Sequence, residues 1–259
     1  MLNYAELHCL SCYSFLRSAS HPHELVERAA ALGYHALAIT DECSLAGVVK
    51  AHVAAKERGI QLIIGSELIL EEGIRLLALV PSRAAYSELS GLISMARRRS
   101  PKGEYRVALR DVIFHLKRCL LIWLPREASA NDRAYGLQLA RLCNNRVWLG
   151  VTHLLGNDEI NRYQLLYQLA EELGLPMVAC GDVQMHCANR KSLHDVFTAL
   201  RHNTSIARLG RRRMANSQQH LRSLDKLQRL YPPALLAETL HIAGQCNFSL
   251  DELRYEYPE

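Results

Sequence analysis

The chain has 259 residues, 49% of them hydrophobic, and a formal net charge of +5. This length suits one large α/β domain or two smaller ones, and the composition is that of an ordinary globular protein. Transmembrane functions are excluded because no apolar run approaches the roughly 20 residues that span a bilayer. The opening residues MLNYAELHCL also lack a basic stretch followed by an apolar one. We therefore expect a cytoplasmic protein with no membrane partner.

The eight cysteines do not predict a disulfide framework. Most of them stand within apolar strand or helix patterns, and their spacing is not that of a small secreted domain. We expect reduced thiols that are mostly buried.

Seven short runs rich in Val, Ile and Leu are the predicted strands. They alternate with segments of helical spacing, which is typical of βαβ units and a parallel sheet. Most are apolar along their length and turn polar only at the C-terminal end, as expected of strands covered on both faces. In chain order the runs are residues 4–10, 35–41, 61–70, 74–81, 119–125, 147–155 and 176–184.

Two helices early in the chain have recognisable ends. The first, SHPHELVERAAALGY, is predicted to begin with Ser20 as its N-cap and to end at Gly33. The second, SLAGVVKAHVAAKERG, is predicted to start at Ser44 and to stop at Gly59.

The strands and helices together favour an α/β fold, a (β/α)7-like barrel that is closed or nearly closed, with a doubly wound open sheet as the second choice. The barrel is expected over residues 1–204. Residues 81–118 interrupt the alternation of strands and helices, because a helix, a basic turn and a weak strand replace a simple crossover. They are expected to form an excursion on the barrel surface. Residues 205–259 are predicted to be a basic loop and a helical extension, and their polar, aromatic ending suggests a cut through a longer protein.

Two runs of arginine make the charge uneven. Such runs are usually solvated surface, but they are also candidates for phosphate contacts with salt-dependent binding. Few aromatic residues lie near them in the sequence, so base stacking is not indicated. An acidic surface on a neighbouring domain is an equally good partner. The runs are Arg97, Arg98 and Arg99, and Arg211, Arg212 and Arg213.

Acidic and imidazole side chains gather where the predicted strands end. In parallel α/β folds these strand ends and the loops after them form the active site. Carboxylate and imidazole side chains are also the ligands of hydrolytic metal centres. The alternative is structural: an aspartate can cap the following helix, and a histidine can be a satisfied core residue. The candidates are Glu6, His8, Asp41, Glu42, Glu67, Thr152, His153, Asp182 and His186.

Several segments resemble a known family. The block from Tyr4 to Glu67, with ELHCLSCYSFL, AITDECSLAGVV and IIGSEL, and the later GDVQMH and LYPPALLAETLHIAGQCNFSLDELRYEYPE, are similar to the N-terminal PHP (polymerase and histidinol phosphatase) domain of bacterial C-family DNA polymerases. Within that family the chain most resembles the error-prone alpha subunits of damage-induced mutagenesis, and the resemblance covers essentially the whole chain.

The first two metal-binding motifs of the family are incomplete here. The His-x-His of the first strand is present as His8 with Leu10 in the second position. The Asp-His after the second strand reads Asp41-Glu42, so a carboxylate stands where a histidine is expected.

The later motifs also depart from the family. The resemblance places Glu67 at the acid of the third motif, but Arg75 stands where the next strand often offers a histidine. The final Asp-x-His reads Asp182-Val183-Gln184, with His186 as a candidate substitute ligand.

The resemblance thus implies a remnant of a metal site. Four ligands remain (His8, Asp41, Glu67, Asp182) and four positions are replaced (Leu10, Glu42, Arg75, Gln184). A guanidinium cannot ligate a cation, so we expect Arg75 to pair with Glu67 or Asp41 and to neutralise carboxylates left without a metal. We expect no cofactor and no catalytic residue in this chain, with zinc, manganese or iron bound only if the site is more complete than the sequence indicates.

The expected function follows from the family. The chain resembles the PHP module of an error-prone, translesion DNA polymerase, a nucleotidyltransferase whose catalytic palm and Mg²⁺ lie downstream, and its own role is then structural. The implied partners are the palm, the thumb and DNA, with mutagenesis accessory proteins and a sliding clamp as further candidates. The alternatives are a metal-dependent phosphoesterase and a residual 3′→5′ exonuclease of the PHP type.

Overall fold

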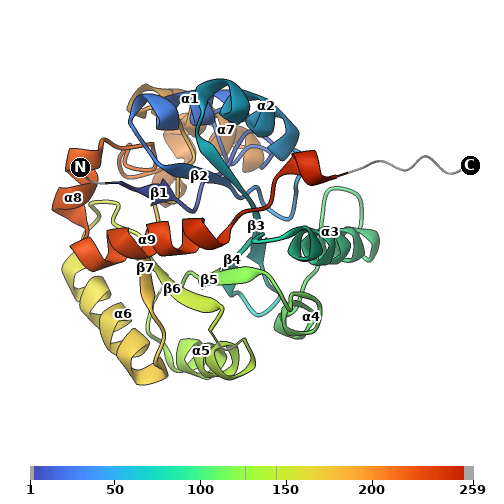
Figure 1. Cartoon of the computed structure of the whole chain (residues 1–259). Helices are drawn as coiled ribbons and strands as arrows, with labels where there is room; N and C mark the ends of the chain where they lie inside the picture. The colour runs from blue at the N-terminus through green and yellow to red at the C-terminus, as the bar shows by residue number, and fades with distance from the viewer. Residues whose placement is uncertain (1–2, 126, 144, 254–259) are drawn as a thin grey trace, which may run out of the picture.

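Seven strands in chain order form one curved sheet (Figure 1). The computed structural model describes residues 3–125, 127–143 and 145–253. The two edges of the sheet meet beyond their strands, where Leu10 N donates to Val183 O (2.8 Å) and Val183 N donates to His8 O (2.9 Å). The strands are β1 (Ala5–Glu6), β2 (Ala36–Ile39), β3 (Gln61–Ile69), β4 (Arg75–Leu79), β5 (Leu120–Trp123), β6 (Val147–Val151) and β7 (Met177–Ala179).

The sheet is mixed, and the prediction of an all-parallel sheet is wrong for one strand. β4 runs antiparallel to both β3 and β5, whereas the other neighbouring pairs are parallel. The reason lies in the connection of residues 70–74, which is too short for a parallel crossover. Gly73, at φ 81°, supplies the left-handed turn of this hairpin.

Nine α-helices are assigned within the described residues. Most of them lie around the outside of the sheet, and the last two belong to the C-terminal segment (Figure 1). They are α1 (Pro22–Ala31), α2 (Val48–Arg58), α3 (Arg83–Arg98), α4 (Leu109–His115), α5 (Ala130–Leu142), α6 (Glu159–Leu173), α7 (Lys191–Arg201), α8 (Leu224–Leu230) and α9 (Pro233–Gln245), with short 3-10 turns at Ala188–Arg190, Ile206–Arg208, Gly210–Arg212 and Leu250–Glu252.

Two predicted helix starts and one predicted strand are wrong. His21, not Ser20, is the N-cap of α1, because the Ser20 hydroxyl is engaged with His186 Nδ1 (2.8 Å). α2 begins at Val48, since the Ser44 hydroxyl accepts from Ala46 N and holds a separate turn. No strand is assigned between α3 and α4, where Val107 O accepts one backbone hydrogen bond from Glu71 N.

Helix α9 closes the end of the barrel at which the strands begin. Its Ile242 and Ala243 pack into the cluster of apolar side chains inside the barrel. The Thr239 hydroxyl accepts from Ala5 N (3.2 Å), and Gln61 Nε2 donates to Ala243 O (3.0 Å). The larger cluster lies between the sheet and the surrounding helices. The eight cysteines are free, as predicted, and no described helix is long and apolar enough to cross a bilayer.

Candidate functional site at the barrel mouth

The mouth is the barrel end at which the parallel strands finish, opposite α9. His8 follows β1, Glu67 stands near the end of β3, and Asp182 follows β7. The antiparallel direction of β4 brings the start of that strand to the same end, because Arg75 pairs in register with Ile69. A parallel β4 would have placed Arg75 at the opposite end of the barrel.

Three predicted ligands meet there, and we call them the mouth triad: His8, Glu67 and Asp182. His8 Nε2 lies 2.8 Å from Glu67 Oε2 and 3.6 Å from Asp182 Oδ1. One ligand atom from each residue lies within 4.8 Å of the others. All three side chains are buried, so the number and kind of donors match part of a metal centre.

Arg75 pairs with two members of the mouth triad. Its Nη2 donates to Glu67 Oε2 (2.7 Å) and to Asp182 Oδ1 (3.2 Å). The expected pairing with Glu67 is therefore confirmed, and the second partner is Asp182 in place of Asp41. Burial opposes the charge on Arg75, but the neighbouring carboxylates outweigh it and raise the pKa of the guanidinium.

A second guanidinium, which the sequence analysis missed, lies on the other side of Glu67. Arg17 Nη1 donates to Glu67 Oε1 (2.6 Å) and to Glu42 Oε2 (2.5 Å). Arg17 stands in the long loop after β1, and no motif in the sequence distinguishes it from a solvated arginine. Glu42, which also accepts from Tyr105 Oη (2.9 Å), thus joins the network as a counter-charge.

These contacts hold the buried acids ionised. Burial by itself raises the pKa of Glu67, but the hydrogen bond with His8 and the charges of Arg75 and Arg17 hold that pKa well below its usual range. The pKa of Asp182 is lowered despite burial, chiefly by Arg75. The hydrogen bond with His8 thus lowers the pKa of Glu67 most, and the charge of Arg75 lowers the pKa of Asp182 most.

Asp41 lies outside the mouth triad. Its carboxylate accepts from Ser11 N (2.8 Å), Ser11 Oγ (2.6 Å) and Ser14 Oγ (2.7 Å). It therefore organises the loop after β1. Burial is the first influence on Asp41 and raises its pKa, although the serine hydrogen bonds oppose the shift.

The other predicted positions also find protein partners. Gln184 Oε1 lies 2.9 Å from His194 Nε2, and Leu10 is fully buried. The His186 ring contacts the Ser20 hydroxyl, and His153 packs edge-on against the Tyr231 ring and lies 3.5 Å from Glu159. Neither histidine belongs to the mouth triad, so neither takes the place of a missing ligand in this arrangement.

Two arginines already bind the carboxylate oxygens that a metal ion at the mouth triad would use. Each oxygen of Glu67 already accepts a hydrogen bond from a guanidinium, and Arg75 also contacts Asp182. A divalent cation in contact with these oxygens would lie next to two fixed positive charges, whose repulsion in a buried site is large. Among the described residues, Arg17 and Arg75 supply the positive charge next to Glu67.

The two arginine runs are partly used inside the protein. Arg97 donates to the backbone carbonyl of Cys43 (3.1 Å), Arg99 pairs with Asp111, and Arg213 Nε donates to Asp195 Oδ2 (2.8 Å). Arg98, Arg211 and Arg212 are exposed. The contact of Arg97 with the segment after β2 places the C-terminal end of α3 beside the mouth.

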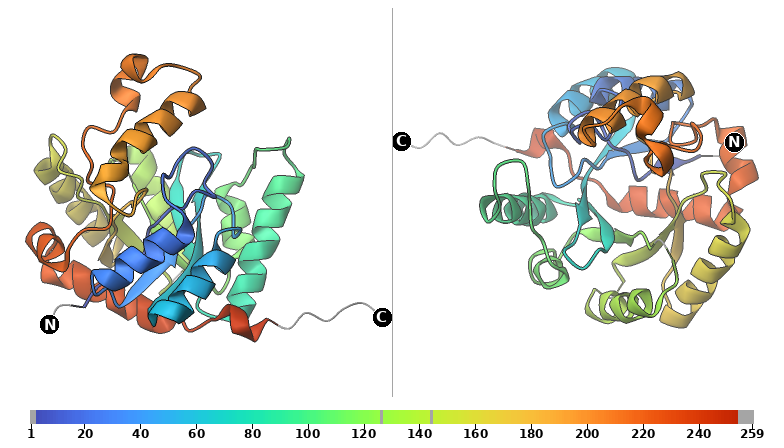
Figure 2. Two further views of the ribbon diagram at one scale, coloured as in Figure 1. Left: turned by 90° about the horizontal axis from the view of Figure 1, so that it is seen from above. Right: turned by 180° about the vertical axis from the view of Figure 1, so that it is seen from behind.

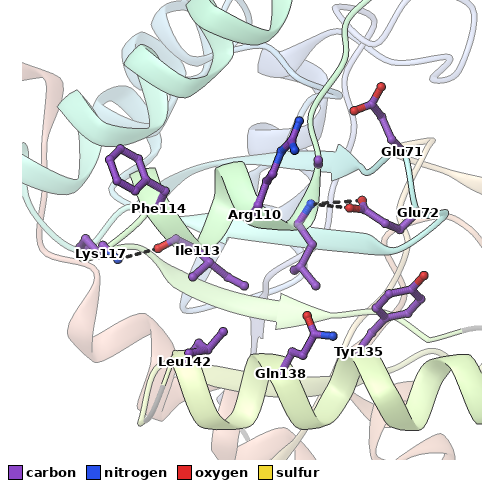
Figure 3. Close-up of a pocket in the computed structure, with 11 residues that line it drawn as sticks. Glu71, Glu72, Arg110, Ile113, Phe114, Lys117, Tyr135, Gln138 and Leu142 are labelled. Carbon is purple, nitrogen blue, oxygen red and sulfur yellow. Dashed lines mark hydrogen bonds between the residues drawn. The ribbon is translucent and has the colours of Figure 1, made fainter.

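A cavity of about 700 Å³ lies elsewhere, between α4 and α5. Figure 3 shows two of its charged groups engaged locally: the Glu72 carboxylate accepts from Leu109 N (3.0 and 3.1 Å), and Lys117 Nζ donates to Ile113 O (2.7 Å). The mouth, and not this cavity, therefore combines convergent charged groups with buried imidazole and carboxylates.

The fold of the chain is similar to that of solved hydrolase-type barrels. A protein from Bifidobacterium adolescentis assigned to the metal-dependent phosphoesterases superimposes with a TM-score of 0.52 at 17% identity, over 70% of this chain and 87% of that one. An amidohydrolase from Chromobacterium violaceum, with bound sulfate and no metal, gives a TM-score of 0.55 at 15% identity, over 70% and 88%. Both likenesses support the α/β barrel architecture alone.

The sequence comparisons are more specific. Residues 6–122 match the family model of the PHP domain. The chain is 51% identical over 258 residues to the error-prone DNA polymerase of Saccharophagus degradans, covering 100% of this chain and 25% of that protein. It is 52% identical to that of Methylococcus capsulatus, covering 98% and 24%. Residues 6–122 therefore belong to the PHP domain family, and the chain over its whole length is similar to the N-terminal region, about a quarter, of error-prone DNA polymerases.

Proposed function

We propose that this chain is the structural PHP module of an error-prone DNA polymerase, with an ion-paired mouth in place of a metal centre. The observation that carries the proposal is the donation of Arg17 and Arg75 to the two oxygens of Glu67. Internal cations supply the charge that a metal would supply, so the buried carboxylates are compensated without an ion. No hydrolytic step is assigned to the mouth, because a hydrolytic PHP centre requires an ion that positions a water molecule.

The proposal extends to the whole protein through its relatives, which are about four times as long as this chain. Nucleotidyl transfer, with Mg²⁺, then belongs to a palm outside the chain, and the module packs against the palm and thumb. DNA is the substrate, and translesion synthesis during DNA repair in the cytoplasm is the process. A sliding clamp and mutagenesis accessory proteins are further proposed partners.

The alternative is a metal-dependent phosphoesterase or a 3′→5′ exonuclease, and the mouth triad is the observation in its favour. The deciding experiment measures metal bound to the purified chain after equilibration with Zn²⁺, Mn²⁺ or Fe²⁺ and removal of free ion. The same samples are assayed for hydrolysis of a phosphate ester and a labelled single-stranded primer. We expect near-zero stoichiometry and no hydrolysis.

Tightly held metal together with hydrolysis that Asp182→Asn abolishes would overturn the structural proposal. Glu6→Gln is a matched control for that variant, because Glu6 is also a buried acid near the strand ends but lies outside the mouth triad. Loss of hydrolysis in both variants would indicate general disruption and would leave the metal measurement to decide.

A further inference from the structure

The outer side of α7 is apolar, which is the reverse of the usual arrangement. A surface helix normally turns its apolar stripe to the core and its polar side chains to water. In α7 the buried polar side chains are His194, Asp195 and Thr198, whereas Val196 is 39% and Leu200 is 60% exposed. The helix is therefore attached to the barrel through polar contacts, and its apolar side chains remain uncovered.

Hydrogen bonds and ion pairs hold the polar side of α7 in place. His194 Nε2 lies 2.9 Å from Gln184 Oε1. The Asp195 carboxylate accepts from Lys191 Nζ (2.8 Å) and from Arg213 Nε (2.8 Å). The apolar side of the helix cannot turn inward without breaking these contacts, so its outward orientation is fixed by the fold.

The apolar side chains of α7 form one continuous stripe. Single exposed leucines are ordinary on a protein surface, but these residues stand at positions i, i+3, i+4 and i+7 and therefore share one face of the helix. None of them belongs to, or packs against, either of the two apolar clusters of the described residues. The members of this α7 stripe are Leu193, Val196, Phe197 and Leu200.

The position and size of the α7 stripe suit a single helix. In the left view of Figure 2, α7 and the turns after it, in orange, project from one end of the barrel. From Leu193 to Leu200 the helix rises about 10 Å, and the exposed Ile206 follows in the next 3-10 turn. A strip of this length, one helix wide, matches an amphipathic helix more closely than the surface of a whole domain.

The charge around the stripe selects an acidic partner. Residues 187–213 contain seven lysines and arginines but one carboxylate, that of Asp195, which is buried and paired. The side chains of Arg208, Arg211 and Arg212 are exposed, and none of them forms a hydrogen bond or an ion pair with another described residue. A second copy of the chain would bring the same positive charge to the contact, which disfavours self-association through this face.

The exposed side chains of this face suit a protein better than a nucleic acid. Val196, Leu200 and Ile206 are aliphatic, so they offer no ring on which a base could stack. Aliphatic side chains with helical spacing are the anchors by which one helix packs on another.

We propose that the α7 stripe docks an amphipathic helix of a separate protein. Its aliphatic side chains lie against Val196 and Leu200, and its carboxylates lie beside the arginines at 208, 211 and 212. Burial of the stripe supplies the affinity, and the charge at its rim selects the partner and speeds association. The inference goes beyond the proposed function and does not depend on whether the mouth binds metal.

The test is fluorescence anisotropy of a labelled synthetic peptide titrated with the chain. The peptide has three heptads, with leucine at the a and d positions and glutamate or alanine elsewhere. We expect binding that weakens as salt rises. Leu200→Ser is expected to weaken it about tenfold, since it removes a buried aliphatic contact. Replacing Arg208, Arg211 and Arg212 together by glutamine is expected to weaken it about fivefold and to reduce its salt dependence.

Matched controls test for a general loss of surface charge or apolar area. Leu165→Ser removes a leucine side chain that is 49% exposed on α6, and Arg83→Gln removes an exposed arginine at the start of α3. Neither is expected to change the affinity. A scrambled peptide, which lacks the apolar stripe, and a peptide with lysine in place of glutamate are not expected to bind. Unfolding temperatures equal to that of the parent confirm that the variants are folded.

The inference is overturned if Leu200→Ser binds like the parent, if Leu165→Ser weakens binding equally, or if the lysine peptide binds as well as the glutamate peptide. A parent chain that sediments as a dimer, with Leu200→Ser as a monomer, would make a second copy the occupant. Displacement of the peptide by oligothymidylate would make nucleic acid the occupant.

The same peptide is then titrated with a full-length polymerase that carries this module, and we expect an unchanged affinity. Binding to the chain but not to the full-length protein would show that another part of the same polypeptide covers the α7 stripe, and it would overturn the separate partner.

Discussion

Arg75 Nη2 lies 2.7 Å from Glu67 Oε2 across the β3–β4 hairpin. Glu67 is fully buried, and the Arg75 side chain is 19% exposed. The pair therefore lies at the boundary between the barrel interior and the mouth, where charges are poorly screened by water. Arg17 completes the compensation from the other side of the same carboxylate.

Arg75→Ala is expected to lower the free energy of unfolding by about 2–3 kcal/mol at pH 7. The substitution leaves Glu67 and Asp182 buried beside each other with one cation removed, and breaking a buried pair costs more than the pair itself contributes. Urea denaturation measures the change, and Arg83→Ala, at an exposed position, serves as the control. Unchanged stability from about pH 6 to 8 would contradict the pairing as a source of stability.

A second prediction concerns the replaced ligand positions. Substituting Leu10→His, Glu42→His, Arg75→His and Gln184→His, together with Arg17→Ala, is expected to create Zn²⁺-dependent stabilisation that the parent chain lacks. The changes remove both internal cations and supply the imidazoles that the PHP family implies. Free Zn²⁺ at 100 times its Kd would add about 2.7 kcal/mol, visible as a rise in Tm.

The control for this variant adds Glu67→Gln, which removes the central carboxylate and should abolish the response to Zn²⁺. A parent chain stabilised by Zn²⁺ to the same extent would show that the arginines do not exclude the ion.

Asp195 predicts an acid-dependent change in stability. Burial opposes its ionisation, but hydrogen bonds from Lys191 Nζ and Arg213 Nε lower the pKa of its carboxyl group. A lowered folded-state pKa gives stability that is present above the unfolded pKa of about 3.9 and is lost as pH falls through the folded value. Asp195→Asn should therefore be less stable than the parent by about 1–2 kcal/mol at pH 7.

The gap in Tm between parent and Asp195→Asn is expected to narrow below about pH 4, where the parent carboxylate becomes protonated. Thermal unfolding at pH 7, 5, 4 and 3 checks this dependence. A gap that stays constant down to pH 3 would show that the contacts to Lys191 and Arg213 do not depend on charge.

Gly47 is expected to be intolerant of a side chain. A Cβ at this position would stand 2.6 Å from Asp41 Oδ2 and 2.9 Å from Ser11 Oγ, so Gly47→Ala must displace the carboxylate that organises the loop carrying Phe15. We expect a loss of about 1–3 kcal/mol in urea denaturation. Gly91→Ala is the control, because a Cβ there meets nothing within 4 Å and alanine favours the helix.

The sequence predicted the elements well because their signals are local. All seven strands lie within the predicted runs, and α2 ends at Gly59 in the left-handed conformation, as expected. The antiparallel orientation of β4 was not predicted, because the apolar composition of a buried strand is the same whether it runs parallel or antiparallel to its neighbours. The short connection at residues 70–74 carried that information.

The resemblance of the sequence to the PHP family also singled out four residues that meet at the mouth: His8, Glu67, Asp182 and Arg75. The tertiary structure alone decided that Arg17 contacts Glu67, that Asp41 turns to Ser11 and Ser14, and that α7 turns its apolar side chains outward. Residue types follow from the chain, but loop conformation depends on contacts between segments distant in sequence, and those contacts determine which charges meet.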